Sequence, residues 1–305
     1  MSAITISRLT KRYGPVVAVD DLSFDAHPGT VTGFLGPNGA GKTTTLRILL
    51  GLAAPTSGTA TIGGLPYHKL PDPARQVGAA LDGNVFHPGR SAAQHLRIIA
   101  TAAGIPARRV PEVLGIVGLT DAAGRRVGGY SLGMRQRLNL AAALLGDPGT
   151  LVLDEPLNGL DPDGIRWMRT MLRTLAAEGR AVLVSSHLLN EVSQTVDDIV
   201  VVSRGRLVTQ GPLAELAGRG ALIRARTTDP ARLVDVLLAA GLRASIADGA
   251  TVEAMAATAD EVGLAAAAAG VPILELTRHD EDLESLFFDL TDKTDKPDTP
   301  QEALS

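Results

Sequence analysis

A glycine-rich segment at residues 36–43 has the residue types and the spacing of a phosphate-binding loop. It reads Gly-Pro-Asn-Gly-Ala-Gly-Lys-Thr and fits the pattern G-x-x-x-x-G-K-S/T in full. Its glycines let the backbone curl so that successive N–H groups point at phosphate oxygens. Lys42 can supply a cation to the β- and γ-phosphates of a nucleotide, and the Thr43 hydroxyl can bind Mg²⁺. The residues predicted to bind the triphosphate are Gly36, Pro37, Asn38, Gly39, Ala40, Gly41, Lys42, Thr43 and Thr44.

Two carboxylates and a histidine follow two other apolar runs. Asp154 and Glu155 come directly after residues 151–153, and His187 comes shortly after residues 181–185. Ligands of open parallel sheets bind beyond the carboxyl ends of the strands, so we expect these groups to meet the phosphates there. The alternatives are an exposed acid pair at the start of a loop and a histidine with a structural role.

Each of these side chains has a predicted chemical task. Asp154 is expected to reach the hydrated Mg²⁺, as the second acid motif of such NTPases does. Glu155 is expected to polarise the attacking water as a general base. The His187 ring can hydrogen-bond the γ-phosphate or the same water. The pattern therefore predicts hydrolysis of a nucleoside triphosphate, with Lys42 as the third catalytic group.

The elements that must hold these groups alternate between apolar runs and helical patterns. Residues 31–35 form an apolar run that leads straight into the phosphate loop, and a helix is expected from about Lys42 to Leu50. Apolar runs flanked by helices indicate a parallel sheet covered on both faces. Residues 4–25 are expected to form three short strands, and residues 83–145 to be mostly helical. We therefore predict an α/β fold of the P-loop NTPase type.

The composition changes beyond about residue 215. Residues 216–290 have the order βαββαβ, which is typical of a small ferredoxin-like α+β module. Asp248-Gly249 is a good hairpin turn, and Thr258 with Glu261 has the spacing of a helix capping box. A last helix is expected at residues 280–290, and the polar tail 291–305 is expected to be disordered. This module has no cluster of site-like residues, so a dimer-stabilising or regulatory role and a plain structural cap remain open.

The bulk composition excludes several classes of protein. The chain has 305 residues, a net charge of −4 and no cysteine. We expect no nucleic-acid partner, because such proteins usually carry a basic face. A disulfide framework and a thiolate metal site are excluded, which fits a reducing compartment. No run approaches the roughly 20 apolar residues needed to cross a bilayer, so we do not expect the chain to span a membrane.

Residues 2–215 resemble the ATP-binding subunits of ABC transporters. Residues 130–137, Tyr-Ser-Leu-Gly-Met-Arg-Gln-Arg, resemble the family's signature segment, usually L-S-G-G-Q. Together with residues 158–161, Asn-Gly-Leu-Asp, they are closest to the drug and antibiotic exporters of the daunorubicin- and bacitracin-resistance type. The resemblance implies an ABC ATP-binding domain at residues 1–215, with an antiparallel β subdomain and a helical subdomain at about 83–145.

The resemblance also implies partners and further site residues. The family binds ATP with Mg²⁺ between two head-to-tail copies, so the second copy would contribute Ser131 and Gly133. Tyr13 matches the aromatic residue that stacks on adenine, and Asp161 is a further predicted nucleotide contact. The domain would dock on a separate polytopic membrane permease, through the helical region around residues 82–89, at the cytoplasmic face of the membrane. Export of a drug, antibiotic or other hydrophobic compound is the expected function.

Two departures from the family pattern affect these expectations. The family usually has glutamine where this chain has Asp82, so we expect a water-mediated rather than a direct contact of Asp82 with the metal. Leu132 and Met134 stand where the signature usually has glycine and glutamine. Two other functions remain as alternatives: a non-transport ATPase of the same superfamily that acts on ribosomes or DNA, and a small-molecule kinase with a P-loop. The kinase leaves the signature segment unexplained.

Overall fold

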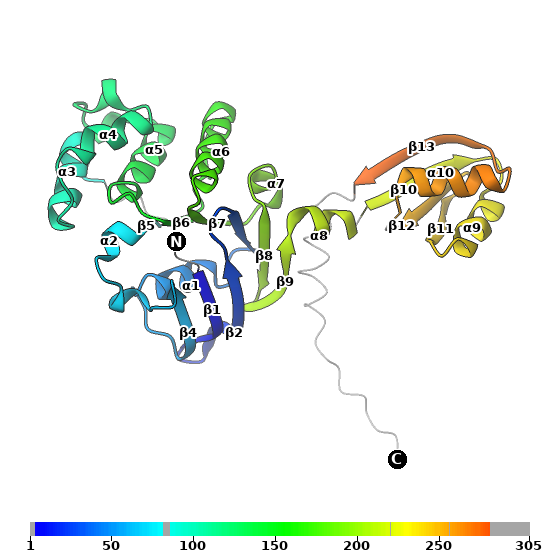
Figure 1. Ribbon diagram of the computed structural model, residues 1–305, viewed down its shortest axis with the longest axis horizontal. Coiled ribbons are helices and arrows are strands. Elements are labelled where there is room, and N and C mark those ends of the chain that lie inside the picture. The colour runs from blue at the N-terminus through cyan, green and yellow to red at the C-terminus, as the bar shows by residue number, and fades with distance from the viewer. Residues whose placement is uncertain (1–3, 82–85, 220, 256, 281–305) are drawn as a thin grey trace, which may run out of the picture. The chain divides into compact units, whose positions relative to one another are not determined.

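The computed structural model describes residues 4–81, 86–219, 221–255 and 257–280. The chain divides into two compact units, residues 1–210 and 211–305 (Figure 1). The division falls five residues before the boundary that the sequence predicts. The predicted last helix, apart from Asp280, and the predicted tail lie outside the described residues, and so do the phosphate-site candidate Asp82 and residues 83–85.

The core of the first unit is a six-stranded sheet in the order β5-β6-β7-β3-β8-β9. The first five of these strands, β5 to β8 in this order, run parallel to one another. Strands β3, β6 and β7 are buried along their whole length, which explains their continuous apolar sequences. The strands are β3 (Val31–Leu35), β5 (Val77–Ala80), β6 (Thr150–Asp154), β7 (Ala181–Ser186), β8 (Asp198–Ser203) and β9 (Arg206–Pro212).

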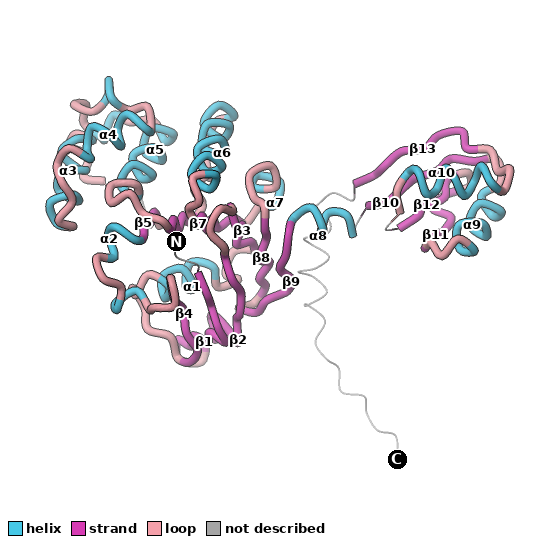
Figure 2. Tube along the Cα trace, viewed as in Figure 1, coloured by secondary structure: helices cyan, strands magenta, loops and turns pink. Residues whose placement is uncertain are grey.

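Helices pack against this sheet and also form a separate layer. Helix α1 contacts β6, and helix α6 contacts β3 and β7. Helices α3, α4 and α5 contact one another and form the helical layer, which Figure 2 shows beside β5, the strand that α5 contacts. The parallel sheet and the helical region are both as predicted. The helices of the first unit are α1 (Lys42–Leu49), α2 (Pro73–Gln76), α3 (Ala92–Ala102), α4 (Arg109–Ile116), α5 (Leu132–Ala143), α6 (Pro162–Ala177) and α7 (Leu189–Val192), while α8 (Leu213–Arg219) belongs to the second unit.

The first unit also contains an antiparallel sheet of three strands, in the order β2-β1-β4. The prediction of three short strands within residues 4–25 is wrong, because two long strands, β1 (Ile4–Tyr13) and β2 (Val16–Ala26), occupy this region. Their pairing has register shifts, and Arg8 and Asp21 adopt positive φ angles of 47° and 51°. These irregular residues interrupt the apolar alternation, so that one strand reads as two pieces. Strand β4 is Ser57–Ile62.

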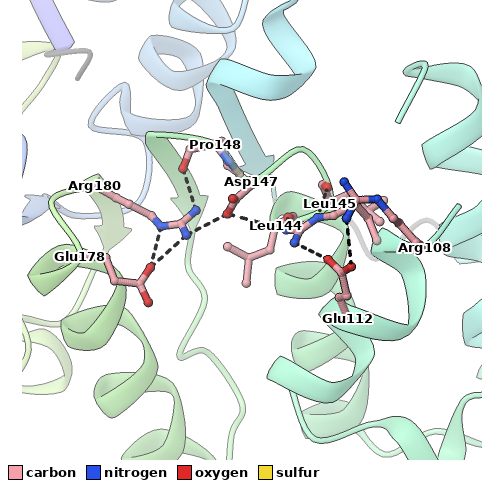
Figure 3. A network of polar contacts seen from close by, with 9 residues as sticks. Arg108, Glu112, Leu144, Leu145, Asp147, Pro148, Glu178 and Arg180 are labelled. Atoms are coloured by element: carbon pink, nitrogen blue, oxygen red, sulfur yellow. Dashed lines mark hydrogen bonds and ion pairs between the residues drawn. The ribbon is translucent and has the colours of Figure 1, made fainter. Parts of the chain in front are cut away.

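A network of arginines and carboxylates joins the helical layer to the parallel sheet (Figure 3). Asp147, just before β6, accepts from Arg180, just before β7, at 2.9 Å. The same oxygen lies 3.7 Å from Arg109 on α4. Arg109 also donates to the carbonyl oxygens of Leu144 and Leu145 at the end of α5. The side chains of Arg109 and Arg180 are mostly buried. This network therefore helps to hold α4 and the end of α5 against the segments that lead into β6 and β7.

The second unit is a four-stranded antiparallel sheet in the order β11-β12-β10-β13. Helices α9 and α10 complete the predicted order βαββαβ, and their apolar sides form a core with the sheet. The predicted capping box at Thr258 is present, with Glu261 as its partner. The elements are β10 (Ala221–Thr227), α9 (Pro230–Ala239), β11 (Arg243–Asp248), β12 (Thr251–Met255), α10 (Ala259–Ala268) and β13 (Ile273–Asp280). Among the described residues of both units, we find no helix with the length and apolar character that a bilayer crossing requires.

Candidate functional site

The phosphate loop connects β3 to α1 at the carboxyl edge of the parallel sheet. Two of its glycines are required by close contacts with neighbouring backbone. A Cβ atom on Gly36 would lie 2.3 Å from the carbonyl oxygen of Val202, and one on Gly41 would lie 2.4 Å from that of Ala18. Gly41 also has a φ angle of 97°, which L residues rarely adopt. Any larger residue at either position would displace the loop.

This loop borders a polar cavity of ≈ 220 Å³. Its lining joins the phosphate loop to the two acids that the sequence singles out, although about 110 residues separate them in the chain. Helix α1 begins at the cavity and points its positive end toward it, as in other anion sites at helix N-termini. The lining residues are Ala18, Pro37, Asn38, Gly39, Ala40, Gly41, Lys42, Thr43, Thr44, Asp154 and Glu155.

Thr43 and Asp154 lie side by side in the lining of this cavity. The Thr43 hydroxyl donates to Oδ2 of Asp154 at 3.1 Å. The other carboxylate oxygen of Asp154 accepts a hydrogen bond from the Ser185 hydroxyl. An alcohol and a carboxylate, both held at one wall of the cavity, are the hard oxygen ligands that Mg²⁺ prefers. The residues present therefore fit a magnesium ion that also contacts phosphate oxygens.

The Lys42 side chain lies inside the curl of the loop. Its ammonium group donates to the carbonyl oxygen of Gly36 at 2.5 Å and lies 3.7 Å from Oε1 of Glu155. Burial lowers the pKa of Lys42, and the nearby carboxylates of Glu155 and Asp154 oppose this effect. The ammonium group is thus held beside the loop's N–H groups, where it can meet phosphate oxygens.

Glu155 and His187 form a hydrogen-bonded pair. Nδ1 of His187 lies 2.9 Å from Oε2 of Glu155. The backbone N–H of Glu155 donates to the Ser185 hydroxyl at 3.0 Å, and Glu155 has a φ angle of 49°, a strained conformation that tends to occur at functional sites. Sequence reasoning treated Ser185 only as the end of a strand. Its signal was a polar residue at the end of the otherwise apolar strand β7.

Ser131, within the signature segment, and Asp161, after the second acid motif, each stand at the start of a helix. The Ser131 hydroxyl accepts from the N–H of Met134 at 3.2 Å, and the Asp161 carboxylate accepts from that of Gly164 at 2.7 Å. Each is therefore an N-cap, of α5 and α6 respectively. Ser131 and Asp161 are exposed, and the residues that line the cavity within this chain include neither of them, nor Gly133.

Tyr13 lies at the end of β1, with half of its surface exposed. The Lys11 ammonium group lies 4.7 Å from the centre of its ring. The described residues that line the cavity include Ala18 of the neighbouring strand β2 but not Tyr13. The structure therefore brings Lys42, Thr43, Asp154, Glu155 and His187 together, and leaves Tyr13 outside the cavity.

Comparison with known proteins connects this site to one family. Residues 19–158 match the family described as ABC transporter, and residues 221–284 match a domain of unknown function. The bacitracin transport ATP-binding protein of Bacillus licheniformis is 43% identical over 219 residues, which cover 71% of this chain and 72% of that protein. The Nod factor export ATP-binding protein I of Burkholderia orbicola is 36% identical over 299 residues, 95% of this chain and 97% of that protein.

Solved structures share the fold of the first unit. An ATP-binding subunit of an ABC transporter superposes with a TM-score of 0.63 at 28% identity, covering 70% of this chain and 91% of the other. A dimeric bacterial ABC transporter cassette superposes with the same TM-score at 23% identity, covering 69% of this chain and 98% of the other. At this identity, the likeness shows a shared fold alone. The phosphate loop, the acids beside it and these relatives agree. The chain therefore belongs to the family of ABC transporter ATP-binding proteins, and it is the ATP-hydrolysing subunit of a transporter.

Proposed function

We propose that this chain drives export of an antibiotic, drug or other hydrophobic compound through separate membrane subunits, with ATP bound between two copies of the chain. The observation that carries the proposal is the meeting of Lys42 and His187 on opposite oxygens of the Glu155 carboxylate, beside the phosphate loop. A relative named for Nod factor export supports the direction of transport, and one named for bacitracin transport supports an antibiotic as the kind of compound.

The proposed hydrolysis uses Glu155 as the base. Its carboxylate accepts a proton from water as the water oxygen attacks the γ-phosphorus and the bond to the β-phosphate oxygen breaks. His187 holds the carboxylate from one side and can hydrogen-bond the water or the γ-phosphate. Lys42 balances the negative charge of the β- and γ-phosphates. Thr43 and Asp154 would hold Mg²⁺, which when bound neutralises charge on the phosphate oxygens.

The signature segment supports a second copy as the partner at the nucleotide. Ser131 is exposed at the start of α5, where a hydroxyl and the first N–H groups of a helix are available to an anion. Because Ser131 does not line the cavity of its own chain, a nucleotide would contact it only across a dimer. Binding of ATP would then hold two copies together, and hydrolysis would release them.

An excess of arginines supports the helical region as the part that docks on the membrane subunit. Residues 86–145 contain eight arginines and only two carboxylates, although the whole chain has a net charge of −4. Arg90 and Arg126 are exposed on two loops that pair through the backbone contact of Ser91 with Arg126. An acidic cytoplasmic segment of the membrane subunit would complement this surface.

The dimer and the active site are tested with one variant. Glu155→Gln should bind ATP and Mg²⁺, dimerise when ATP is added, and show almost no turnover. Size-exclusion chromatography with light scattering measures the dimer, and phosphate release measures turnover. A Glu155→Gln chain that stays monomeric at saturating ATP, or that hydrolyses ATP at the wild-type rate, would contradict the proposal.

The transport role is tested by the partner. Purification of the tagged chain from detergent-solubilised membranes should recover a polytopic membrane protein. The ATPase activity of the recovered complex can then be measured with and without candidate hydrophobic compounds. Recovery of ribosomes or DNA in place of a membrane protein would favour the non-transport alternative.

A further inference from the structure

The signature segment and the loop after the catalytic acid interlock within one chain. A Cβ atom added to Gly159 would lie 2.5 Å from Cδ2 of Leu132, and one added to Gly133 would lie 3.7 Å from Cδ2 of Leu160. Each segment thus places a leucine on a glycine of the other segment. Leu132 is the residue that stands where the signature usually has glycine.

This interlock is connected to Glu155 by a short hydrogen-bonded turn. The N–H of Asn158 donates to the carbonyl oxygen of Glu155 at 3.2 Å, and the next residue is Gly159. Helices α5 and α6 also touch directly, where the Arg137 guanidinium stacks 4.3 Å from the ring centre of Trp167. One contact with the loop before α6 and one with α6 itself therefore restrict how α5 can move.

The exposure of Leu132 argues against a role in stability alone. The residue keeps 44% of its surface exposed, so little apolar area is gained by its contact with Gly159. Gly159 has a φ angle of 70°, and its missing side chain is what admits the leucine. The large side chain of Leu132 fills the space that the missing side chain of Gly159 leaves. This contact lies where the helix that begins after Ser131 meets the loop that begins at Glu155.

We propose that Leu132 is a positioning residue for ATP hydrolysis, which acts through Gly159 on the loop that carries Glu155. When the signature segment of a chain binds a nucleotide, the position of Leu132 sets the position of Gly159. The loop that contains Gly159 in turn positions the Glu155 carboxylate of the same chain. The inference rests on the proposed ATP-bound dimer. It assigns a task to the leucine that distinguishes this signature from the usual one.

The test is a double-mutant cycle in the full chain, with ATP turnover as the readout. Gly159→Ala places a methyl group 2.5 Å from Cδ2 of Leu132 and forces the leucine off the loop, so kcat should fall by about tenfold, with KM for ATP changed by no more than about twofold. Leu132→Ala leaves the glycine uncovered and should lower kcat by about threefold or more. Combining the two changes restores the match in size, so kcat should return to within about threefold of wild type.

Gly104→Ala is the matched control for backbone strain. Gly104 also has a positive φ angle, of 65°, but no atom lies within 4 Å of its missing Cβ. Its substitution should leave kcat unchanged. If the double variant is no more active than Gly159→Ala, or if Gly159→Ala behaves like Gly104→Ala, Leu132 does not position the loop and the inference is wrong.

Two measurements keep the outcome clear. Binding of a fluorescent ATP analogue shows whether each variant binds nucleotide. An unfolding curve followed by the fluorescence of Trp167, the only tryptophan, shows whether it is folded. If Gly159→Ala does not fold, Leu132→Ala decides alone, and an unchanged kcat in that variant overturns the inference. Failure of the parent Glu155→Gln chain to dimerise would instead contradict the proposed function, before any of these variants is compared.

Discussion

The imidazole of His187 lies 2.9 Å from one oxygen of Glu155, while the ammonium group of Lys42 lies 3.7 Å from the other. The acid and the histidine follow the adjacent parallel strands β6 and β7. A carboxylate held on both sides has little freedom to rotate away from a bound nucleotide. Its position, and not only its basicity, is therefore set by its neighbours.

Replacement of His187 by alanine should slow ATP hydrolysis by between about tenfold and a hundredfold, because the carboxylate loses one of its two side-chain contacts. Glu155→Gln should cost about a hundredfold or more, since it removes the base itself. Phosphate release under saturating ATP measures both. Adding His187→Ala to Glu155→Gln should cause little further loss, and a fully multiplicative loss would show that the histidine acts independently of the glutamate.

Gly41→Ala should weaken ATP binding by about tenfold or more, because the new methyl group would lie 2.4 Å from the carbonyl oxygen of Ala18. Titration with a fluorescent ATP analogue measures the affinity. Gly104→Ala is the control, because Gly104 has a φ angle of 65° and no atom lies within 4 Å of its missing Cβ. Equal affinities in the two variants would mean that strain alone, and not the contact with Ala18, shapes the loop.

Asp147→Asn should lower the free energy of unfolding of the first unit by about 1–2 kcal/mol. The change keeps the size of the side chain and its tolerance for the φ angle of 56°, but removes the charge shared by Arg109 and Arg180. Urea unfolding followed by Trp167 fluorescence reports on this unit alone, because α6 belongs to it.

The control for the Asp147 variant is Asp163→Asn. Asp163 pairs with Arg166 on the surface, where both side chains are largely exposed. The expected loss is below about 0.5 kcal/mol. A loss in Asp147→Asn that is no larger than this would show that the network in Figure 3 adds nothing to stability.

The first unit should lose stability in mild acid partly through His95. Burial, followed by the nearby Arg90, lowers the pKa of His95 below its ordinary value near 6.5. The unfolded chain therefore binds a proton more readily than the folded chain, so the contribution is present above about pH 6.5 and is lost as the pH falls through the folded-state pKa. His95→Gln should show a smaller loss of unfolding free energy between pH 7 and pH 5.

The same acid titration in the exposed His68→Gln variant is the control for His95. It should follow the wild-type curve. Trp167 fluorescence again serves as the probe, since His95 lies on α3 of the first unit. A wild-type and a His95→Gln curve that fall in parallel from pH 7 to pH 5 would contradict the prediction.

Motifs fixed by local sequence were predictable, and contacts between distant segments were not. The phosphate loop follows from its glycines, and the parallel strands follow from continuous apolar runs, because both signals lie within a few residues. The bulged strands β1 and β2 were divided wrongly, since Arg8 and Asp21 break the alternation without breaking the strand.

The supports of the site depend on the fold. Ser185 holds both Asp154 and Glu155, yet its role appears only when β7 lies beside β6. Arg109, Asp147 and Arg180 are spread over some 70 residues, and no spacing in the sequence relates them. For Asp82, Tyr13 and the contacts across a dimer, the predictions stand untested.

The seating of Leu132 on Gly159 has a consequence for anyone who exchanges signature segments between members of this family. A Gly-Gly-Gln sequence placed in this chain would lack the side chain that contacts Gly159. In the reverse exchange, a relative with alanine at the position of Gly159 would have no room for the leucine. Successful chimeras should therefore carry both segments from the same parent.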